Sequence, residues 1–328
     1  MLKLLPIFIT VVGLLFSACT PDAPRSNPLD PFHQAAVESG GQLKGQVMQK
    51  TAPFPPLPFC DVFILPEKKF TSTDEDGRFL FTALQAGGHQ LIAAKSGYDS
   101  IRVDIPADSV VNGGIFIYMN TRPLFENLRI HSEYIDQWWP EPVLSVIAEA
   151  TVHDADGEGD IESLWLNIAD YDSGFVFATT FRPDSFVLRL EEQDFPGNDL
   201  ADIVGKSLRA TVLDRDSSRS VITDAKLVRI ISPSPEAIAP TGLAVADPSP
   251  LFEWQPFIAA YRFSYFVSVY FIRAGVPTLM FTSDPLPVQQ LNYQYPDSLS
   301  SGTYFWTVSA LDAFGNIGRS KEASFTVP

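Results

Sequence analysis

The sequence is poor in the residue types from which many catalytic and metal sites are built. It has 2 cysteines and 4 histidines in 328 residues, and no two histidines have the spacing of a zinc motif. A Gly-x-Ser-x-Gly nucleophile elbow is absent. Positive charge is scarce, with 23 Lys and Arg against 39 Asp and Glu. We therefore expect no enzyme, and the net charge of -16 argues against binding nucleic acid through a basic surface.

The sequence also lacks an apolar run of transmembrane length. Residues 1–18 combine Lys3 with an apolar run from Ile7 to Phe16 and the small residues Ser17 and Ala18, which is typical of a secretion signal. Ten helical residues span about 15 Å, half of a hydrocarbon core of about 30 Å. We therefore expect a signal peptide and not a stable membrane span.

The residues that end this run, Leu15 to Cys19, resemble the lipobox of bacterial lipoproteins, with Phe16 at a position usually held by Leu. The resemblance implies that Cys19 carries lipid and becomes the first mature residue. Residues 19–40 would then form a flexible tether from a membrane. It also implies an exported protein anchored at the outer membrane or cell surface. An ordinary signal peptide with an incidental cysteine is the alternative.

The second cysteine, Cys60, would be left alone if Cys19 carries lipid, so no disulfide could form within the mature chain. The folds would then be held by packing alone. Because Cys60 lies in an apolar strand pattern, we expect a buried small hydrophobe and not a nucleophile.

The remainder of the chain has the pattern of β structure. Pro (27) and Gly (20) are frequent, and no other apolar stripe of helical period exceeds about ten residues. The short alternating segments predict an all-β protein of three tandem β-sandwiches, over residues 41–121, 122–232 and 233–328. The segment Ser232 to Pro235 predicts a short, stiff linker between the last two.

In the first module, Phe79, Phe81 and Ala83 share one predicted strand face, directly after an Asp-Gly turn. Consecutive motifs here carry a family resemblance: Gly45 to Val47, Phe59 to Leu65, Thr73 to Phe81, Ala86 to Leu91 and Lys95 to Tyr98. They resemble the carboxypeptidase regulatory-like domain, a prealbumin-like sandwich related to carbohydrate-binding folds. The resemblance implies an accessory or connecting module without catalytic residues.

The two later modules resemble immunoglobulin-like folds. Residues 146–166 resemble a bacterial immunoglobulin-like domain, and the segments 250–254 and 301–310 resemble strands B and F of a fibronectin type III domain. Alternation predicts three buried strand faces: Leu164, Leu166 and Ile168; Phe186, Leu188 and Leu190; and Tyr304, Trp306, Val308 and Ala310. We also assign Trp165, Trp254 and Trp306 to cores.

An acidic loop that begins at Asp154 is the sharpest candidate site. Oxygen-bearing side chains at the first, third and fifth positions and Gly159 at the sixth match the start of a calcium loop. Trp165 stands where that pattern needs a bidentate acid. Clustered acids repel unless they are solvated or bridged by a cation. Two interpretations stay open, a solvated turn or calcium bound by Asp154, Asp156, Glu158 and Asp160.

Trp138 and Trp139 are the second candidate. Adjacent aromatic side chains near a module boundary could form a stacking platform for sugar rings or a surface for a partner protein. The alternative is that the two rings pack at an interface between modules.

Together these features predict a non-catalytic, lipid-anchored envelope or cell-surface protein that binds or scaffolds proteins through its modules. The alternative is a carbohydrate-binding accessory lipoprotein that serves a separate glycan hydrolase or importer. No cofactor other than calcium is expected. The sequence does not identify the protein or polysaccharide ligand.

Overall fold

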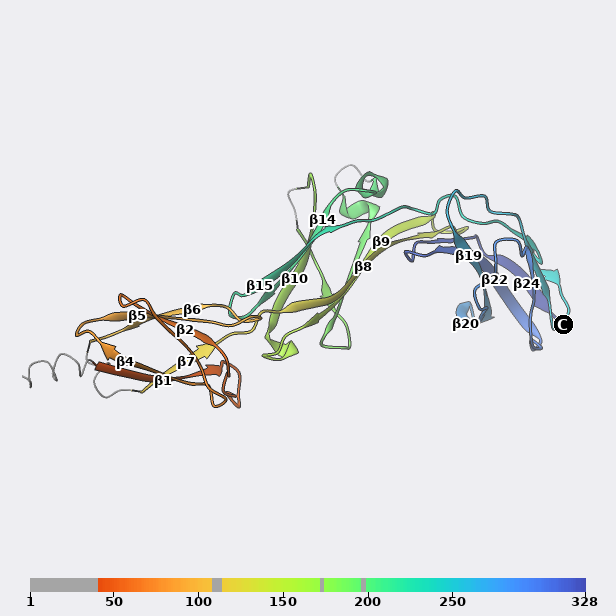
Figure 1. Cartoon of the computed structure of the whole chain (residues 1–328). Coiled ribbons are helices and arrows are strands. Elements are labelled where there is room, and N and C mark those ends of the chain that lie inside the picture. The colour runs from red at the N-terminus through yellow and green to blue at the C-terminus, as the bar shows by residue number, and fades with distance from the viewer. Residues whose placement is uncertain (1–40, 108–113, 172–173, 196–198) are drawn as a thin grey trace, which may run out of the picture. The chain divides into compact units, whose positions relative to one another are not determined.

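The computed structural model describes residues 41–107, 114–171, 174–195 and 199–328, so the predicted signal, the tether and Cys19 lie outside it. The described part is all β, as the sequence predicts. Its only helical elements are the short 3₁₀ helices η1 (Glu158–Asp160), η2 (Glu192–Asp194) and η3 (Leu200–Ile203). None of its helices has the length and apolar character needed to cross a membrane. The chain divides into two compact units, Met1–Asn120 and Thr121–Pro328 (Figure 1).

Unit 1 is a β-sandwich. Its described strands are β1 (Gly41–Gln49), β2 (Asp61–Leu65), β3 (Lys69–Ser72), β4 (Arg78–Leu84), β5 (His89–Ala94), β6 (Ile101–Ile105) and β7 (Gly114–Met119). One sheet has the order β4-β1-β7 and the other the order β3-β2-β5-β6, and only the β1–β7 pair is parallel among these strands. The inward side chains of both sheets, such as Leu43, Val62, Leu91 and Ile117, form one buried core.

Strand β4 differs from its prediction at one residue. Phe79 and Phe81 are buried as expected, but Ala83 is exposed and Leu84 lies in the core. The cause is a β-bulge, because β4 advances from Phe81 to Leu84 while β1 advances by only two residues. Ala83 takes up the extra residue with a φ of 52°, so the side-chain alternation shifts by one.

The predicted turn before β4 depends on glycine. Gly77 has a φ of 71°, and a Cβ there would lie 2.5 Å from the carbonyl oxygen of Val47. Asp74 closes the turn, since its Oδ1 accepts hydrogen bonds from the backbone N–H groups of Asp76 and Arg78 at 3.0 and 2.8 Å. The turn thereby sets the start of β4.

Unit 2 contains two further sandwiches. The described strands of the first are β8 (Leu124–Ile135), β9 (Val143–His153), β10 (Ile161–Ile168), β11 (Gly174–Val176), β12 (Ala178–Thr179), β13 (Ser185–Glu191), β14 (Leu208–Asp214) and β15 (Arg219–Ala225). The described strands of the second are β16 (Ala237–Ala239), β17 (Ala244–Val245), β18 (Leu251–Trp254), β19 (Phe263–Arg273), β20 (Val276–Thr282), β21 (Asn292–Gln294), β22 (Gly302–Asp312), β23 (Ile317–Arg319) and β24 (Ala323–Val327). Sheet β11-β10-β14-β15 packs on β12-β13-β9-β8, and β16-β18-β21 packs on β23-β22-β19-β20.

The predicted core faces of β10, β13 and β22 are all buried. Trp254 and Trp306 also lie in the core, where the Trp306 ring packs on Phe252. The assignment of Trp165 to a core was wrong. Trp165 is only half-buried, because it lies between Leu164 and Leu166 in β10 and so points to the opposite face of the sheet.

The two sandwiches of unit 2 share one sheet. Strand β8 pairs in parallel with β23, so that the described strands form a continuous ten-stranded sheet (Figure 1). The backbones approach closely here, because a Cβ on Gly318 would lie 2.6 Å from the carbonyl oxygen of Ile231. Ile231, which directly precedes the segment predicted as a linker, is fully buried. Within that segment Pro235 is buried, and the Ser234 hydroxyl donates to Asp136 at 3.3 Å.

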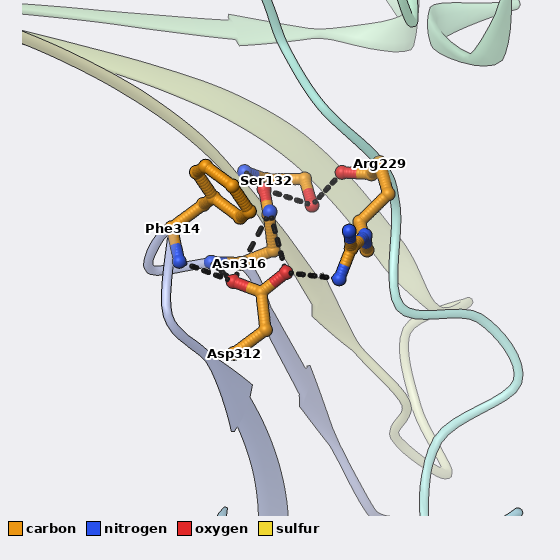
Figure 2. A network of polar contacts seen from close by, with 5 residues as sticks. All are labelled: Ser132, Arg229, Asp312, Phe314 and Asn316. Carbon is orange, nitrogen blue, oxygen red and sulfur yellow. Dashed lines mark hydrogen bonds and ion pairs between the residues drawn. The ribbon is translucent and has the colours of Figure 1, made fainter. Parts of the chain in front are cut away.

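A buried carboxylate closes this junction (Figure 2). Asp312 ends β22, and its Oδ1 accepts hydrogen bonds from the backbone N–H groups of Phe314 and Asn316 at 2.9 and 3.0 Å. Its Oδ2 accepts from Asn316 Nδ2 at 3.0 Å and from Arg229 Nη1 at 3.1 Å. Asn316 Oδ1 in turn accepts from the backbone N–H of Ser132 at 2.9 Å, and the Ser132 hydroxyl donates to the carbonyl of Arg229 at 3.0 Å. The network joins β8, the segment before β16 and the β22–β23 turn.

We predict that Asp312→Ala destabilises unit 2 by about 2–4 kcal/mol, because the buried donors that now share this carboxylate lose their hydrogen-bond acceptor. Urea unfolding of the full chain, followed by tryptophan fluorescence, measures this change. Asp247→Ala is the matched control, because Asp247 is exposed and its loss should change stability by less than about 0.5 kcal/mol. Equal unfolding midpoints for Asp312→Ala and the wild type would contradict the role given to the network.

Candidate functional site

Two loops at one end of the first sandwich of unit 2 bring acidic side chains together. The β9–β10 loop contains Asp154 and, at the end of η1, Asp160. The β14–β15 turn begins at Asp214. The antiparallel register brings these loops side by side, because Ile161 pairs with Asp214 and the N–H of Arg215 donates to the carbonyl of Asp160 at 2.9 Å.

One carboxylate oxygen from each of Asp154, Asp160 and Asp214 lies within 4.8 Å of the other two. We call these three residues the acidic triad. Asp154 and Asp214 are buried, and Asp160 is half-buried. Oxygen atoms in this arrangement are the ligands that hard divalent cations prefer.

The two buried members of the triad also hold their own loops. Asp214 Oδ1 accepts hydrogen bonds from the backbone N–H groups of Asp216 and Ser218 at 2.9 and 2.7 Å. Asp154 Oδ1 accepts from the backbone N–H of Asp156 at 2.9 Å and from the Thr121 hydroxyl at 2.5 Å. Asp154 Oδ2 is buried and has no hydrogen-bond partner among the residues that the structure describes.

The carboxylates of the triad repel one another. Burial raises the pKa of the Asp154 carboxyl, and the negative charges of Asp156 and Asp214 add to this rise. Burial likewise raises the pKa of Asp160, and the carboxylates of Asp214 and Asp154 raise it further. Either protons or a cation can relieve this concentration of negative charge.

The four acids of the predicted calcium loop do not converge on one point in the structure but make different contacts. Asp154 and Asp160 belong to the triad. Asp156 instead uses its Oδ2 to accept from the backbone N–H of Thr121 at 2.6 Å. Glu158 is half-buried, with its Oε1 3.9 Å from Nδ1 of His153. Asp214 was missed by the sequence analysis, because only its pairing opposite Ile161 reveals that it lies near the loop.

The two adjacent tryptophans differ in their surroundings. Trp138 is 71% exposed, yet its Nε1 donates to the carbonyl of Glu322 at 2.8 Å and Lys321 Nζ lies 4.5 Å from the centre of its ring. It borders a cavity of about 330 Å³, whose other lining residues come mainly from the segments before β16 and β24. Trp139 is 87% exposed. Trp138 thus packs on the loop before β24, while Trp139 projects into solvent.

Cys60 lies directly before β2 and is fully buried. Its Sγ lies 3.4 Å from the carbonyl oxygen of Ala94 and 3.5 Å from the sulfur of Met119. Burial raises the pKa of the Cys60 thiol, which disfavours the nucleophilic thiolate.

No family model matches the chain, and no curated protein matches its sequence. Several solved structures are similar to it at low identity. The major pilin subunit BcpA of Bacillus cereus is 8% identical, with a TM-score of 0.30 over 84% of this chain and 91% of the pilin. The FN1-FN3 domains of chicken CNTN1 are 8% identical, with a TM-score of 0.33 over 88% of this chain and 98% of that one. The fibronectin(III)-like modules of Clostridium thermocellum CbhA are 12% identical, with a TM-score of 0.30 over 62% of this chain and 92% of that one. Similarity at this level does not indicate what the chain binds.

We predict that Cys60 in the folded protein reacts with a disulfide reagent at pH 8 orders of magnitude more slowly than after urea unfolding, because the thiol is buried and protonated. The reaction is followed by absorbance in a Cys19→Ala background, so that Cys60 is the only thiol. A Ser72→Cys variant that also lacks Cys60 supplies the control, since position 72 is exposed and should react at once. Rapid labelling of folded Cys60 would contradict the prediction.

Proposed function

We propose that the protein is a non-catalytic surface protein whose modules hold binding surfaces in fixed positions and scaffold partner proteins. The observation that supports this function is the continuous sheet of unit 2. Two sandwiches joined by β8–β23 pairing and a buried polar network form a stiff body, unlike domains that meet through a flexible linker. Loops at the ends of such a body keep constant distances from one another.

Unit 1 fits an accessory role in this proposal. Its described strands make a two-sheet sandwich with the orders β4-β1-β7 and β3-β2-β5-β6. A sandwich fold is compatible with the resemblance of its sequence motifs to the carboxypeptidase regulatory-like domain, whose members serve as accessory or connecting modules. Unit 1 would then carry unit 2 and supply no chemistry of its own.

The anchor in the proposal is lipid on Cys19. The lipobox-like sequence supports it, together with the polar composition of residues 20–39. A single acyl chain binds a membrane only weakly, so stable anchoring depends on the several chains that lipoproteins of this kind carry. The proposed location is the outer membrane or the cell surface.

We predict that a clickable fatty acid labels the wild-type protein in expressing cells and that Cys19→Ala abolishes this label. Cys60→Ala is the matched control, because it removes the other cysteine and should leave the label unchanged. Protease shaving of intact cells should then digest the labelled chain from outside. Absence of label on the wild type would refute the anchor, and protection from the protease would refute surface exposure.

A second candidate function is carbohydrate binding, and the exposure of Trp139 favours it. An indole that projects into solvent beside a second, anchored indole offers an apolar face of the kind on which sugar rings stack. Lys321 and Glu322 lie next to Trp138 and supply polar groups for sugar hydroxyls. In this alternative the protein delivers polysaccharide to a separate hydrolase or importer.

We predict for this alternative that a native gel containing the recognised polysaccharide retards the wild type, and that Trp139→Ala weakens the retardation about tenfold. The experiment uses a panel of bacterial-envelope and plant polysaccharides. Phe181→Ala is the matched control, because Phe181 is 96% exposed in the same unit. If no polysaccharide retards the protein, or if Trp139→Ala behaves as the wild type does, the carbohydrate function is wrong.

A further inference from the structure

The acidic triad contains an oxygen that the described structure leaves unsatisfied. Asp154 is 1% exposed, and while its Oδ1 accepts two hydrogen bonds, its buried Oδ2 accepts none. A buried carboxylate oxygen without a donor or a cation is rare in folded proteins, because desolvation of the charge is not compensated. One oxygen each of Asp160 and Asp214 lies within 4.8 Å of a ligand oxygen of Asp154. We propose that Asp154, Asp160 and Asp214 bind a calcium ion.

The charges around the triad favour a cation. The largest charge effects on Asp160 come from Asp214, Asp154, Asp216 and Asp156, which all carry the same sign. Asp214 is fully buried and Asp154 nearly so, so solvent screens their repulsion poorly. A divalent cation among the three carboxylates converts this repulsion into attraction.

The spacing of the oxygens suits calcium. Calcium binds oxygen at about 2.3–2.6 Å, so two oxygens on opposite sides of one ion lie about 4.6–5.2 Å apart. The corresponding limit for magnesium is about 4.2 Å, in a strict octahedron that retains several waters. The triad oxygens all lie within 4.8 Å of one another, a separation that the calcium shell can span. Water and backbone carbonyls would complete its six to eight ligands.

Two of the three ligands are already fixed in place. Asp154 is held by Thr121 and by its own loop, and Asp214 is held by the backbone of the β14–β15 turn. The ion would tie the β9–β10 loop to the β14–β15 turn and, through Thr121, to the residue at which unit 2 begins. Calcium should therefore stabilise unit 2.

The tryptophans allow unit 2 to be followed selectively. All 5 tryptophans of the chain belong to unit 2, so thermal unfolding followed by tryptophan fluorescence reports this unit. The full chain is first stripped with EGTA and then titrated with calcium chloride in a calorimeter. We expect saturable binding of one ion, and a rise in Tm of about 5 °C or more at a hundredfold excess over Kd.

Asp160→Asn is the decisive variant, because Asp160 is half-buried and its side chain accepts no hydrogen bond from another described residue, unlike those of Asp154 and Asp214. It should abolish the calcium-dependent rise in Tm. In EGTA it should unfold no earlier than the wild type, since it removes one of several repelling charges. Glu158→Gln makes the same change of charge on the same loop, at a half-buried residue outside the triad, and should keep the full response.

Three results would overturn the proposal. The first is a wild type that neither binds calcium in the calorimeter nor gains Tm at millimolar calcium. The second is an Asp160→Asn variant that responds as the wild type does. The third is an equal response to magnesium chloride at the same concentration, which would exclude a site selective for calcium. None of these outcomes bears on the anchor or the scaffold role, which are tested separately.

Discussion

The structure of unit 2 depends on the parallel pairing of β8 with β23. Each of these strands ends the sheet of its own sandwich, where unpaired N–H and C=O groups would otherwise face solvent. The pairing satisfies both edges at once. It also brings Ser132 beside the β22–β23 turn, where Asn316 and Asp312 continue the hydrogen-bonding inward to Arg229. The guanidinium of Arg229 lies over the ring of Tyr261 at 4.1 Å, so this cation is packed as well as paired.

Much of the fold could be predicted because alternation in a strand is a local signal. The core faces of β10, β13 and β22 follow directly from residues two apart, and an all-β fold follows from many such segments separated by Pro and Gly. The errors have local causes too. A bulge at Ala83 changed the alternation of β4, and Trp165 was assigned by its residue type although it is out of phase with Leu164.

The sequence could not predict what depends on pairing between distant segments. Tyr134 of β8 pairs with Gly318 of β23, but the sequence of neither strand indicates which strand is its partner. The candidate metal site could be predicted only in part for the same reason. Asp154 and Asp160 lie in one acidic loop of the sequence, whereas Asp214 is brought to them only by the β10–β14 register. The exposure of Trp139 likewise follows from the loop before β24, which engages Trp138 and leaves the next ring free.

The shared sheet also bears on how such a chain could evolve. Domains in tandem arrays are commonly duplicated or exchanged one at a time, which requires that each be complete after it is cut from its neighbours. Neither sandwich of unit 2 meets that requirement. A cut at Ile231 would disrupt a buried residue of the junction and open the edges of β8 and β23. It would also leave Asp312 without Arg229 and Asn316 without Ser132. The heritable module is therefore the pair of sandwiches, and gene rearrangements that separate them should be selected against.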